Sequence, residues 1–284
     1  MALEGKSREA GAPSLSPVGP RTVDRILALL DCFTPARHHL SLRELSQAMG
    51  LHRSTVHRLA TRLCAAGYLE HDRERATYRL GLRLFELGAI VLTDMELVTQ
   101  ARPHLEALRD ETGETTHLGV LDHGEVVYVE KFEGEHLLNL TSPVGSRRPP
   151  HCTSLGKVLL AHLDERDVVR IAEVTGLPRY TEHTIGDVAT LLDELRRVRA
   201  SGYAVDNEET DIGLRCVAVP IRDFTGQVVA SVGISGSTSR LRLEALPALV
   251  ELLAAHAERI SVAMGWGGTG GAWNRTETQP HRLP

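Results

Sequence analysis

The sequence predicts an α+β protein of two domains, in which short helices and one hairpin precede a larger domain of mixed strands and helices. Three observations lead to this prediction. The chain has 284 residues, more than a single domain usually has. Apolar residues recur at helical spacing near the N-terminus, and farther on strand-like runs alternate with helical segments. A hydrophobic content of 42% with 24% charged residues is typical of a globular protein with packed cores.

The N-terminal domain, expected to span residues 21–81, begins with two predicted helices. The first should run from a cap at Thr22 to about Phe33, and its apolar residues at helical spacing are Val23, Ile26, Leu27 and Leu30. Ser41 precedes the second helix and Gly50 ends it, and both residue types are typical helix signals. The apolar side of this helix consists of Leu42, Leu45 and Met49.

A third predicted helix and a hairpin complete this domain. The helix begins near Arg53 and is closed by Gly67, and its inward side consists of Val56, Leu59, Ala60 and Leu63. Residues 68–80 alternate loosely around a charged turn at 72–75, as a short two-stranded wing would. Two short helices joined by a turn with glycine, the second followed by a hairpin, are typical of a winged helix-turn-helix. The sequence therefore predicts binding to double-stranded DNA.

The side of the third helix opposite its apolar residues carries the groups expected to bind DNA. Hydroxyls and guanidiniums suit phosphates and base edges, and Arg58 is the expected bidentate partner of a guanine. The predicted DNA-binding residues are Arg53, Ser54, Thr55, His57, Arg58, Thr61 and Arg62 on the helix, with Arg73 and Arg75 on the wing. A merely solvated helix face is the alternative. Charge favours DNA, because residues 21–90 hold eleven arginines against seven acidic side chains although the whole chain has a net charge of -5.

A linker helix at 82–96 should connect this domain to the C-terminal domain at 97–265, within a helical region that reaches about Thr112. Pro103 should bend this region or mark a boundary between two helices. The strands expected next are 115–122 and 125–132, a hairpin about His123 and Gly124, then 137–142, and later 215–223 and 227–235. The helices expected here are 154–163, 165–174, 188–200 and 241–264. Residues 1–20 and 266–284 lack periodicity and are interpreted as flexible tails.

Composition excludes several classes of protein. No stretch approaches the roughly 18 apolar residues of a membrane span, and the first twenty residues lack the apolar block of a secretory signal, so a cytoplasmic location is expected. The four cysteines are scattered without a paired spacing, so neither a disulfide framework nor a zinc ribbon is indicated.

Several separated stretches of the sequence carry a resemblance to a known family. In the N-terminal half they are TVDRILALLDCF, LSLRELSQAMGLHRSTVHRLATRLCAAGYLEHD and TYRLGLRLFELG. Farther on they are ETGETTHLGVLDHGEVVYVEK, PPHCTSLGKVLLAHL, SGYAVDNEETDIGLRCVAVPIRD and VVASVGISG. Together, from about Arg21 to Met264, they resemble the IclR family of transcriptional regulators.

This resemblance implies a regulator that forms homodimers or dimers of dimers, expected here to be a repressor, with activation left open. It also implies a GAF-like mixed α/β domain that binds a small organic or aromatic acid. By similarity, the pocket would include Leu137, Cys152, Asp206, Cys216 and Ser235. Gly233 stands where relatives that bind very small keto acids often carry serine, and Ser154-Leu155 replaces a Gly-Ala pair, which disfavours ligands of glyoxylate size.

Residue chemistry gives this pocket partial independent support. Thr153 can cap a helix that starts at Ser154, which would leave the backbone N–H groups of Ser154, Leu155 and Gly156 to hold a carboxylate. Lys157 would add positive charge nearby. Asp206 is expected to accept a hydrogen bond from a ligand hydroxyl or from backbone N–H groups, since it would repel a second carboxylate.

Other interpretations stay open at this stage. Asp206 can also be a turn or cap residue, and Cys216 a small buried hydrophobe. His151, Cys152, Asp206 and Cys216 could bind zinc, although no cofactor is expected and their spacing is unlike a standard ligand motif. The C-terminal domain could serve oligomerisation alone. An enzyme acting on a small carboxylate would have to use dispersed groups such as His117, whose spacing identifies no nucleophile and base.

Overall fold

The computed structural model describes residues 22–34, 36–94, 96–135 and 142–267. The chain divides into two compact units, one ending at Asp94 and the other beginning at Met95. Each unit is described by itself. The predicted tail at 1–20, residues 268–284 of the tail predicted at 266–284, residues 137–141 of the strand predicted at 137–142 and the site residue Leu137 lie outside the described residues.

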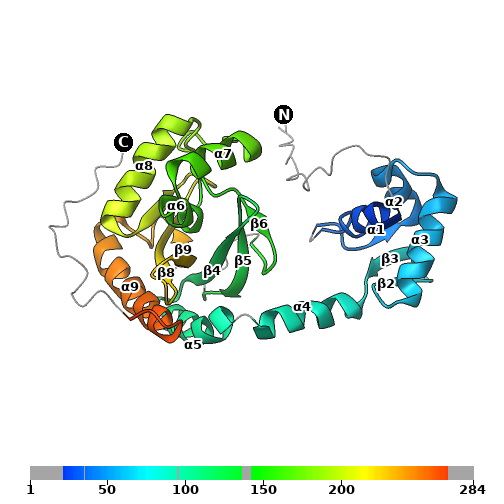
Figure 1. Cartoon of the computed structure of the whole chain (residues 1–284), viewed down its shortest axis with the longest axis horizontal. Helices are drawn as coiled ribbons and strands as arrows, with labels where there is room; N and C mark the ends of the chain where they lie inside the picture. Colours follow the sequence, from blue (N-terminus) through cyan, green and yellow to red (C-terminus); the bar gives the residue numbers. More distant parts are fainter. Residues whose placement is uncertain (1–21, 35, 95, 136–141, 268–284) are drawn as a thin grey trace. The chain divides into compact units, whose positions relative to one another are not determined.

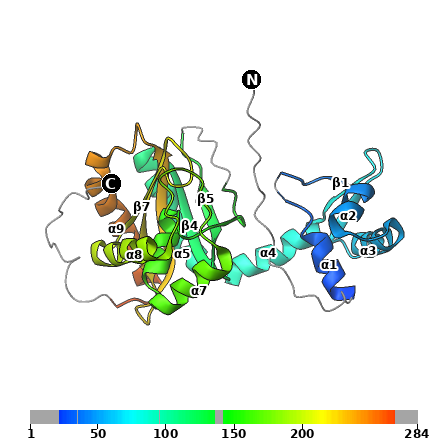
Figure 2. The same ribbon diagram turned by 90° about the horizontal axis from the view of Figure 1, so that it is seen from above.

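The first unit is a helix-turn-helix with a wing, as predicted (Figures 1 and 2). Its elements are α1 (Thr22–Leu30), β1 (Leu40–Ser41), α2 (Leu42–Met49), α3 (Arg53–Ala65), β2 (Leu69–Asp72), β3 (Thr77–Leu80) and α4 (Leu82–Asp94). The strands form an antiparallel sheet in the order β1-β3-β2. The core beneath α3 contains Leu29, Leu45, Val56, Leu59, Ala60, Leu63, Leu69 and Tyr78.

Local signals set the ends of α2. The Ser41 hydroxyl accepts a hydrogen bond from the Glu44 N–H, and the Glu44 carboxylate accepts one from the Ser41 N–H at 2.8 Å, which is a capping box. Gly50 ends the helix in the left-handed conformation, with φ of 61°. The apolar residues that predicted α1 do not all face the core, because Val23 and Leu27 are 65% and 47% exposed, whereas Leu29 is fully buried. Thr22 is the first residue of α1 and not its cap.

The second unit is built on an antiparallel sheet with six strands among the described residues, in the order β6-β5-β4-β9-β8-β7. The strands are β4 (Thr115–Asp122), β5 (Glu125–Phe132), β6 (Arg147–Arg148), β7 (Ala204–Asn207), β8 (Leu214–Arg222) and β9 (Val228–Ser237). The helices are α5 (Glu96–Thr112), α6 (Ser154–Ala161), α7 (Glu165–Thr175), α8 (Val188–Ser201), the short 3-10 helix η1 (Leu243–Ala245) and α9 (Leu246–Ala263).

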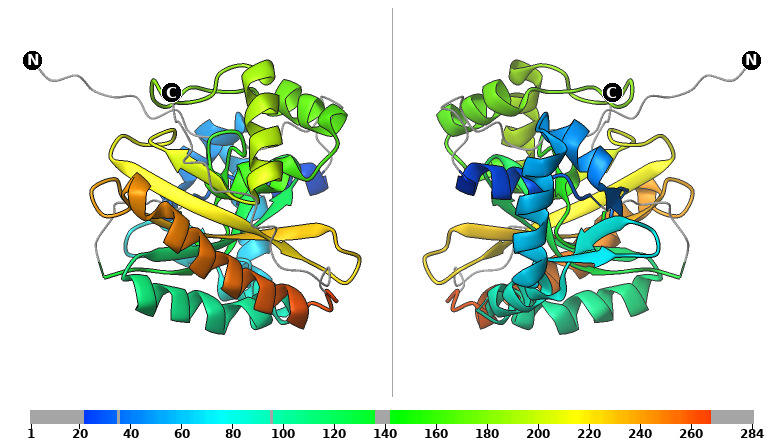
Figure 3. Two further views of the ribbon diagram at one scale, coloured as in Figure 1. Left: turned by 90° about the vertical axis from the view of Figure 1, so that its left-hand side faces the viewer. Right: turned by 90° about the vertical axis from the view of Figure 1, so that its right-hand side faces the viewer.

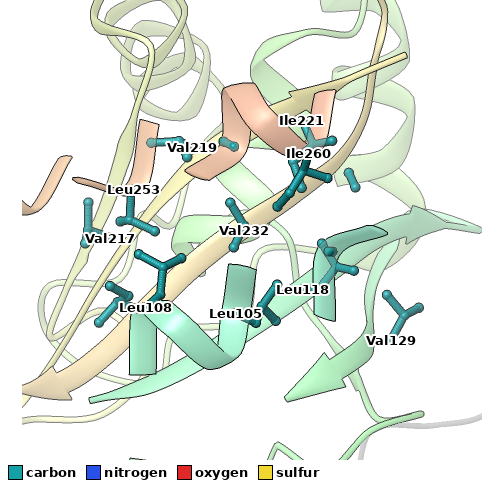
Figure 4. Packing of buried hydrophobic residues seen from close by; sticks show 14 of the residues in the cluster. Leu105, Leu108, Leu118, Val129, Val217, Val219, Ile221, Val232, Leu253 and Ile260 are labelled. Atoms are coloured by element: carbon teal, nitrogen blue, oxygen red, sulfur yellow. The ribbon is translucent and has the colours of Figure 1, made fainter. Parts of the chain in front are cut away.

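Helices cover both faces of this sheet (Figures 1 and 3). On one face α5 and α9 pack through residues such as Leu105, Leu108 and Leu253 against Val217 and Val232 of the sheet (Figure 4). On the other face α6 and α8 form a second core. All eight residues of α6 are buried, which its nearly continuous apolar sequence explains.

Two predictions for this unit are wrong in detail. Of the two alternatives predicted for Pro103, the helix boundary is wrong, because Pro103 lies inside α5; α4 ends at Asp94 and α5 begins at Glu96. Pro103 and Thr99, whose carbonyl loses its N–H donor, are both exposed, so water can bind that carbonyl. The final helix begins at Leu246, after η1, and not at Leu241. The short strands β1, β6 and β7 were not predicted.

Candidate functional site

The outer side of α3 presents basic side chains that the protein does not neutralise. Arg53, Arg58 and Arg62 are exposed, and α3 has no acidic residue. Within the described part of the chain, neither these three guanidinium groups nor that of Arg73 on the wing has an ion pair or hydrogen bond. Arg75 lies 3.8 Å from the carboxylate of Asp72. A duplex is the kind of polyanion that such a surface can bind.

The hydroxyls predicted to bind DNA are partly used inside the helix. The Ser54 hydroxyl is hydrogen-bonded to Nδ1 of His52, the N-cap residue, at 2.8 Å. Thr61 donates to the His57 carbonyl at 2.8 Å, and Thr55 is half-buried. The exposed groups of this face without such internal bonds are therefore His57 and the three arginines.

The second unit contains a cavity between the sheet and the N-terminal end of α6, with a volume of about 110 Å³. This is room for a small organic molecule and not for one water alone. Eight of the ten residues predicted to bind an effector line it, namely Cys152, Thr153, Ser154, Leu155, Asp206, Cys216, Gly233 and Ser235. Gly156 does not line it. The lining residues that sequence reasoning did not assign to the pocket include His117, Tyr128, Arg148, Tyr180 and Thr210.

Strand register brings these distant residues together. Cys216 on β8 lies opposite Ser235 on β9 and, on its other side, opposite Asp206 on β7. Two residues before Ser235 on β9, Gly233 lies opposite His117 on β4. Directly opposed residues of antiparallel strands lie on the same face of a sheet, so both sets of opposed residues lie on the face toward α6.

The helix N-terminus at this cavity matches the prediction in part. Thr153 is the N-cap of α6 and its hydroxyl accepts from the Gly156 N–H at 3.3 Å. The prediction that Gly156 offers a free N–H is therefore wrong. Among the described residues no acceptor pairs with the N–H groups of Ser154 and Leu155, so these two are left to bind an anion at the positive end of the helix.

Lys157 does not add charge to the cavity as predicted. Its side chain is 1% exposed, and its ammonium group donates to Glu209 Oε1 and the Val205 carbonyl, both at 2.5 Å, and lies 3.5 Å from Glu194. These partners raise the pKa of Lys157 in spite of its burial. The charge is therefore used to hold α6, α8 and the segment after β7 together.

Asp206 lies at the cavity in the role of an internal acceptor. Its carboxylate accepts from the Glu209 N–H and from the Thr210 hydroxyl, each at 2.8 Å. Burial raises the pKa of Asp206 to about 6, against the opposing effect of Lys157, and burial raises that of Glu209 to about 7. The cavity therefore contains a carboxyl group that is partly protonated near neutral pH.

Among the described residues, the thiols and the histidine considered for zinc are not brought together as a group of metal ligands. Burial raises the pKa of both Cys152 and Cys216, so the thiols keep their protons. His151 is bonded to the Pro178 carbonyl at 3.1 Å. In the described ranges no group of three or more histidine, cysteine, aspartate or glutamate side chains could hold a metal ion. No helix among the described residues is long and apolar enough to cross a bilayer.

Replacing Gly156 with alanine should destabilise the second unit by about 1–3 kcal/mol, because the added Cβ would overlap the Cα and the carbonyl of Pro150. The matched control is Gly88→Ala, since Gly88 lies in α4 with nothing within 4 Å of its added Cβ and should gain about 0.5–1 kcal/mol. Urea unfolding followed by circular dichroism measures both changes. Equal stability of Gly156→Ala and the wild type would contradict the described approach of α6 to Pro150.

Comparison with known proteins identifies the family. The profile described as the IclR helix-turn-helix domain matches residues 22–73, and the profile described as bacterial transcriptional regulator IclR C-terminal matches residues 89–262. The chain belongs to the IclR family. It is 37% identical over 246 residues to the HTH-type transcriptional regulator XynR of Escherichia coli K12, covering 87% of this chain and 98% of XynR.

Solved IclR structures agree with this assignment. The Thermotoga maritima IclR is 32% identical with a TM-score of 0.72, and the match covers 86% of this chain and 99% of that one. An IclR homolog from Microbacterium hydrocarbonoxydans, complexed with 4-hydroxybenzoate, is 27% identical with a TM-score of 0.77 and the same two coverages, 86% and 99%.

The family assignment confirms the predicted fold class and the general function. This IclR protein is a DNA-binding transcriptional regulator with a winged helix-turn-helix and a C-terminal α/β effector-binding domain. The family consists of transcriptional regulators, so the enzyme alternative is set aside.

Proposed function

We propose that this regulator binds a small organic acid in the cavity at α6 and that the bound acid changes its affinity for an operator. The observation that carries the proposal is the cavity itself, which is lined by Arg148 and by the N-terminus of α6, where the N–H groups of Ser154 and Leu155 have no acceptor among the described residues. Positive helix ends and guanidinium groups both favour a carboxylate.

The rest of the lining favours an acid with an aromatic or hydroxylated body. Tyr128 and Tyr180 supply ring surface, and Asp206 and Thr210 supply oxygen atoms. The complex of the Microbacterium hydrocarbonoxydans relative with 4-hydroxybenzoate supports this class of ligand. The carboxylate would bind at Ser154 and Leu155, and the ring would lie against the tyrosines.

We further propose that the regulator acts as a homodimer or a dimer of dimers on a pseudo-palindromic operator. Two copies of α3 would enter successive major grooves, with Arg58 at base edges and Arg53, Arg62, Arg73 and Arg75 at phosphates. The exposed apolar residues Val23 and Leu27 on α1 support self-association, because a second copy would remove them from water.

A panel of hydroxylated, keto and aromatic acids tests the ligand class. The melting temperature of the full-length protein should rise with ligand concentration. At a ligand concentration of a hundred times Kd, the free energy of unfolding should increase by about 2.7 kcal/mol. The second candidate function, oligomerisation alone, predicts no shift with any acid. A flat response across the panel, with the protein folded, would therefore favour that candidate over a sensor.

The affinity for an anionic ligand should increase as the pH falls. Because the pKa of Asp206 is about 6, its protonated fraction rises about eightfold from pH 7 to pH 5.5, and a carboxylate prefers the cavity without this second negative charge. Calorimetric titration with benzoate at both pH values measures the change, up to about eightfold tighter at pH 5.5. The variant Asp206→Asn should lose this pH dependence, and an unchanged dependence in the variant would show that another group causes it.

A further inference from the structure

A pair of histidines joins α5 to α9, on the face of the sheet opposite α6. Nδ1 of His104 on α5 lies 3.1 Å from Nδ1 of His256 on α9, and the ring centroids are 5.3 Å apart. His256 is only 4% exposed and His104 is half-buried. Leu108 and Ile260, each one turn farther along its helix, are fully buried in the core. The two rings therefore lie at the edge of the packed interface between α5 and α9.

The geometry limits how many protons this pair can carry. A hydrogen bond between two Nδ1 atoms needs one ring to donate and the other to accept, so the neutral rings must be in opposite tautomers. One added proton leaves the bond intact, because a protonated ring still donates to a neutral one. A second added proton would make both Nδ1 atoms donors, facing each other with like charges at 3.1 Å. The closed pair therefore holds at most one extra proton.

The charged groups around the pair agree with this limit. Burial is the largest cause that lowers the pKa of each histidine, and His256 lowers that of His104 further. Arg259 on α9 lowers both pKa values. Glu111 on α5 has the opposite effect on His256, because its carboxylate lies 3.6 Å from Nε2 of that ring. Among the described residues, no charged group of the sheet beneath these helices alters either pKa.

We infer that this histidine pair is an acid-sensitive latch between α5 and α9. The latch is closed while the pair carries at most one extra proton, and it opens when both rings are protonated. In the open state each ring can bind a proton near pH 6.5, the ordinary pKa of histidine. α5 begins at Glu96, two residues after α4 ends, so opening loosens the segment that directly follows α4. This inference does not depend on the acid proposed for the cavity.

The direction of the pH effect follows from the protons bound in each state. A histidine whose pKa is lowered in the closed state binds its proton mainly in the open state, so the latch is most stable above about pH 6.5 and weakens below it. One additional proton in the open state raises the open fraction about tenfold for each unit that the pH falls. The effect is opposite to that of Glu209, whose raised pKa makes its surroundings more stable in acid.

Hydrogen exchange of the full-length protein tests the latch, with rates resolved by mass spectrometry and divided by the intrinsic rate at each pH. From pH 6.5 to pH 5.5 the protection of amides in α5 and α9 should fall about tenfold, whereas α8 on the opposite face should show no fall. The double variant His104→Gln/His256→Gln keeps polar side chains without a titrating ring, so protection in α5 and α9 should change less than about twofold. The control His123→Asn removes a histidine that is 86% exposed and should behave as the wild type.

The single variants keep the test decisive if circular dichroism shows that the double variant does not fold. His104→Gln and His256→Gln should each reduce the tenfold effect to about threefold or less, because no second positive charge then faces the remaining ring. An unchanged fall in protection in the double variant, or in both single variants, would overturn the inference. So would a wild type whose α5 and α9 exchange independently of pH, or an equal fall in α8, which would indicate unfolding of the whole unit. These outcomes leave the proposed acid sensor untouched.

Discussion

Replacing Arg58 with alanine should weaken operator binding by about 1–3 kcal/mol, up to roughly a hundredfold, and should relax sequence preference at one base pair of each half-site. The physical reason lies in α3, where Arg58 is exposed and has no internal partner among the described residues, so its guanidinium is available to a guanine edge. Fluorescence anisotropy with an operator duplex selected from a random pool by the full-length protein measures the loss.

Two matched variants show whether that loss is specific. Arg62→Ala should remove a phosphate contact, which weakens binding to all sequences alike and lowers the salt dependence by about one unit of slope. Arg170→Ala, an exposed arginine of α7 paired with Asp167, should leave operator affinity unchanged. Unaltered affinity and unaltered sequence preference in Arg58→Ala would show that Arg58 does not contact the bases of the operator.

Replacing Lys157 with methionine should destabilise the second unit by about 3–5 kcal/mol at pH 7.5. The substitution keeps an apolar chain of similar length but leaves Glu209 and the Val205 carbonyl buried without their donor. Without Lys157 the pKa of Glu209 should rise farther above its present value of about 7. Denaturant unfolding monitored by circular dichroism measures the loss.

The pH dependence of the stability lost in Lys157→Met follows from the upward direction of the Glu209 pKa shift. A carboxyl with a raised folded pKa costs stability once the pH exceeds its unfolded pKa, and the cost grows until the folded pKa is passed. The deficit of Lys157→Met should therefore be smaller at pH 5.5 than at pH 7.5. Adding Glu209→Gln should recover part of it. A control, Lys131→Met, breaks a pair with the exposed Glu133 and should cost less than about 1 kcal/mol; a similar cost for both lysines would contradict the buried network.

The sequence predicted the features that depend on neighbours in the chain. The helix between Ser41 and Gly50, the hairpin at His123 and the cap at Thr153 are all predicted from short-range patterns, and each is present. The apolar spacing of α3 likewise predicted that its basic side chains face outward, because the side of a helix opposite its buried apolar residues faces away from the core.

The remaining features depend on residues that are distant in sequence. The partners of Lys157 lie 37, 48 and 52 residues away, so its apparent availability to a ligand was misleading. The place of His117 at the cavity depends on the register of β4 with β9, which no single segment reveals. Arg148 had no periodic pattern around it, and its place at the cavity follows from the pairing of β6 with β5.

The most direct test of the account is operator affinity measured with and without a saturating acid, chosen as the member of the panel with the highest affinity. If the cavity and the winged helix are coupled, the acid should change operator Kd by about 5- to 150-fold, and saturating operator should change the Kd of the acid by the same factor. Calorimetric saturation of the cavity with operator affinity and assembly both unchanged would contradict it.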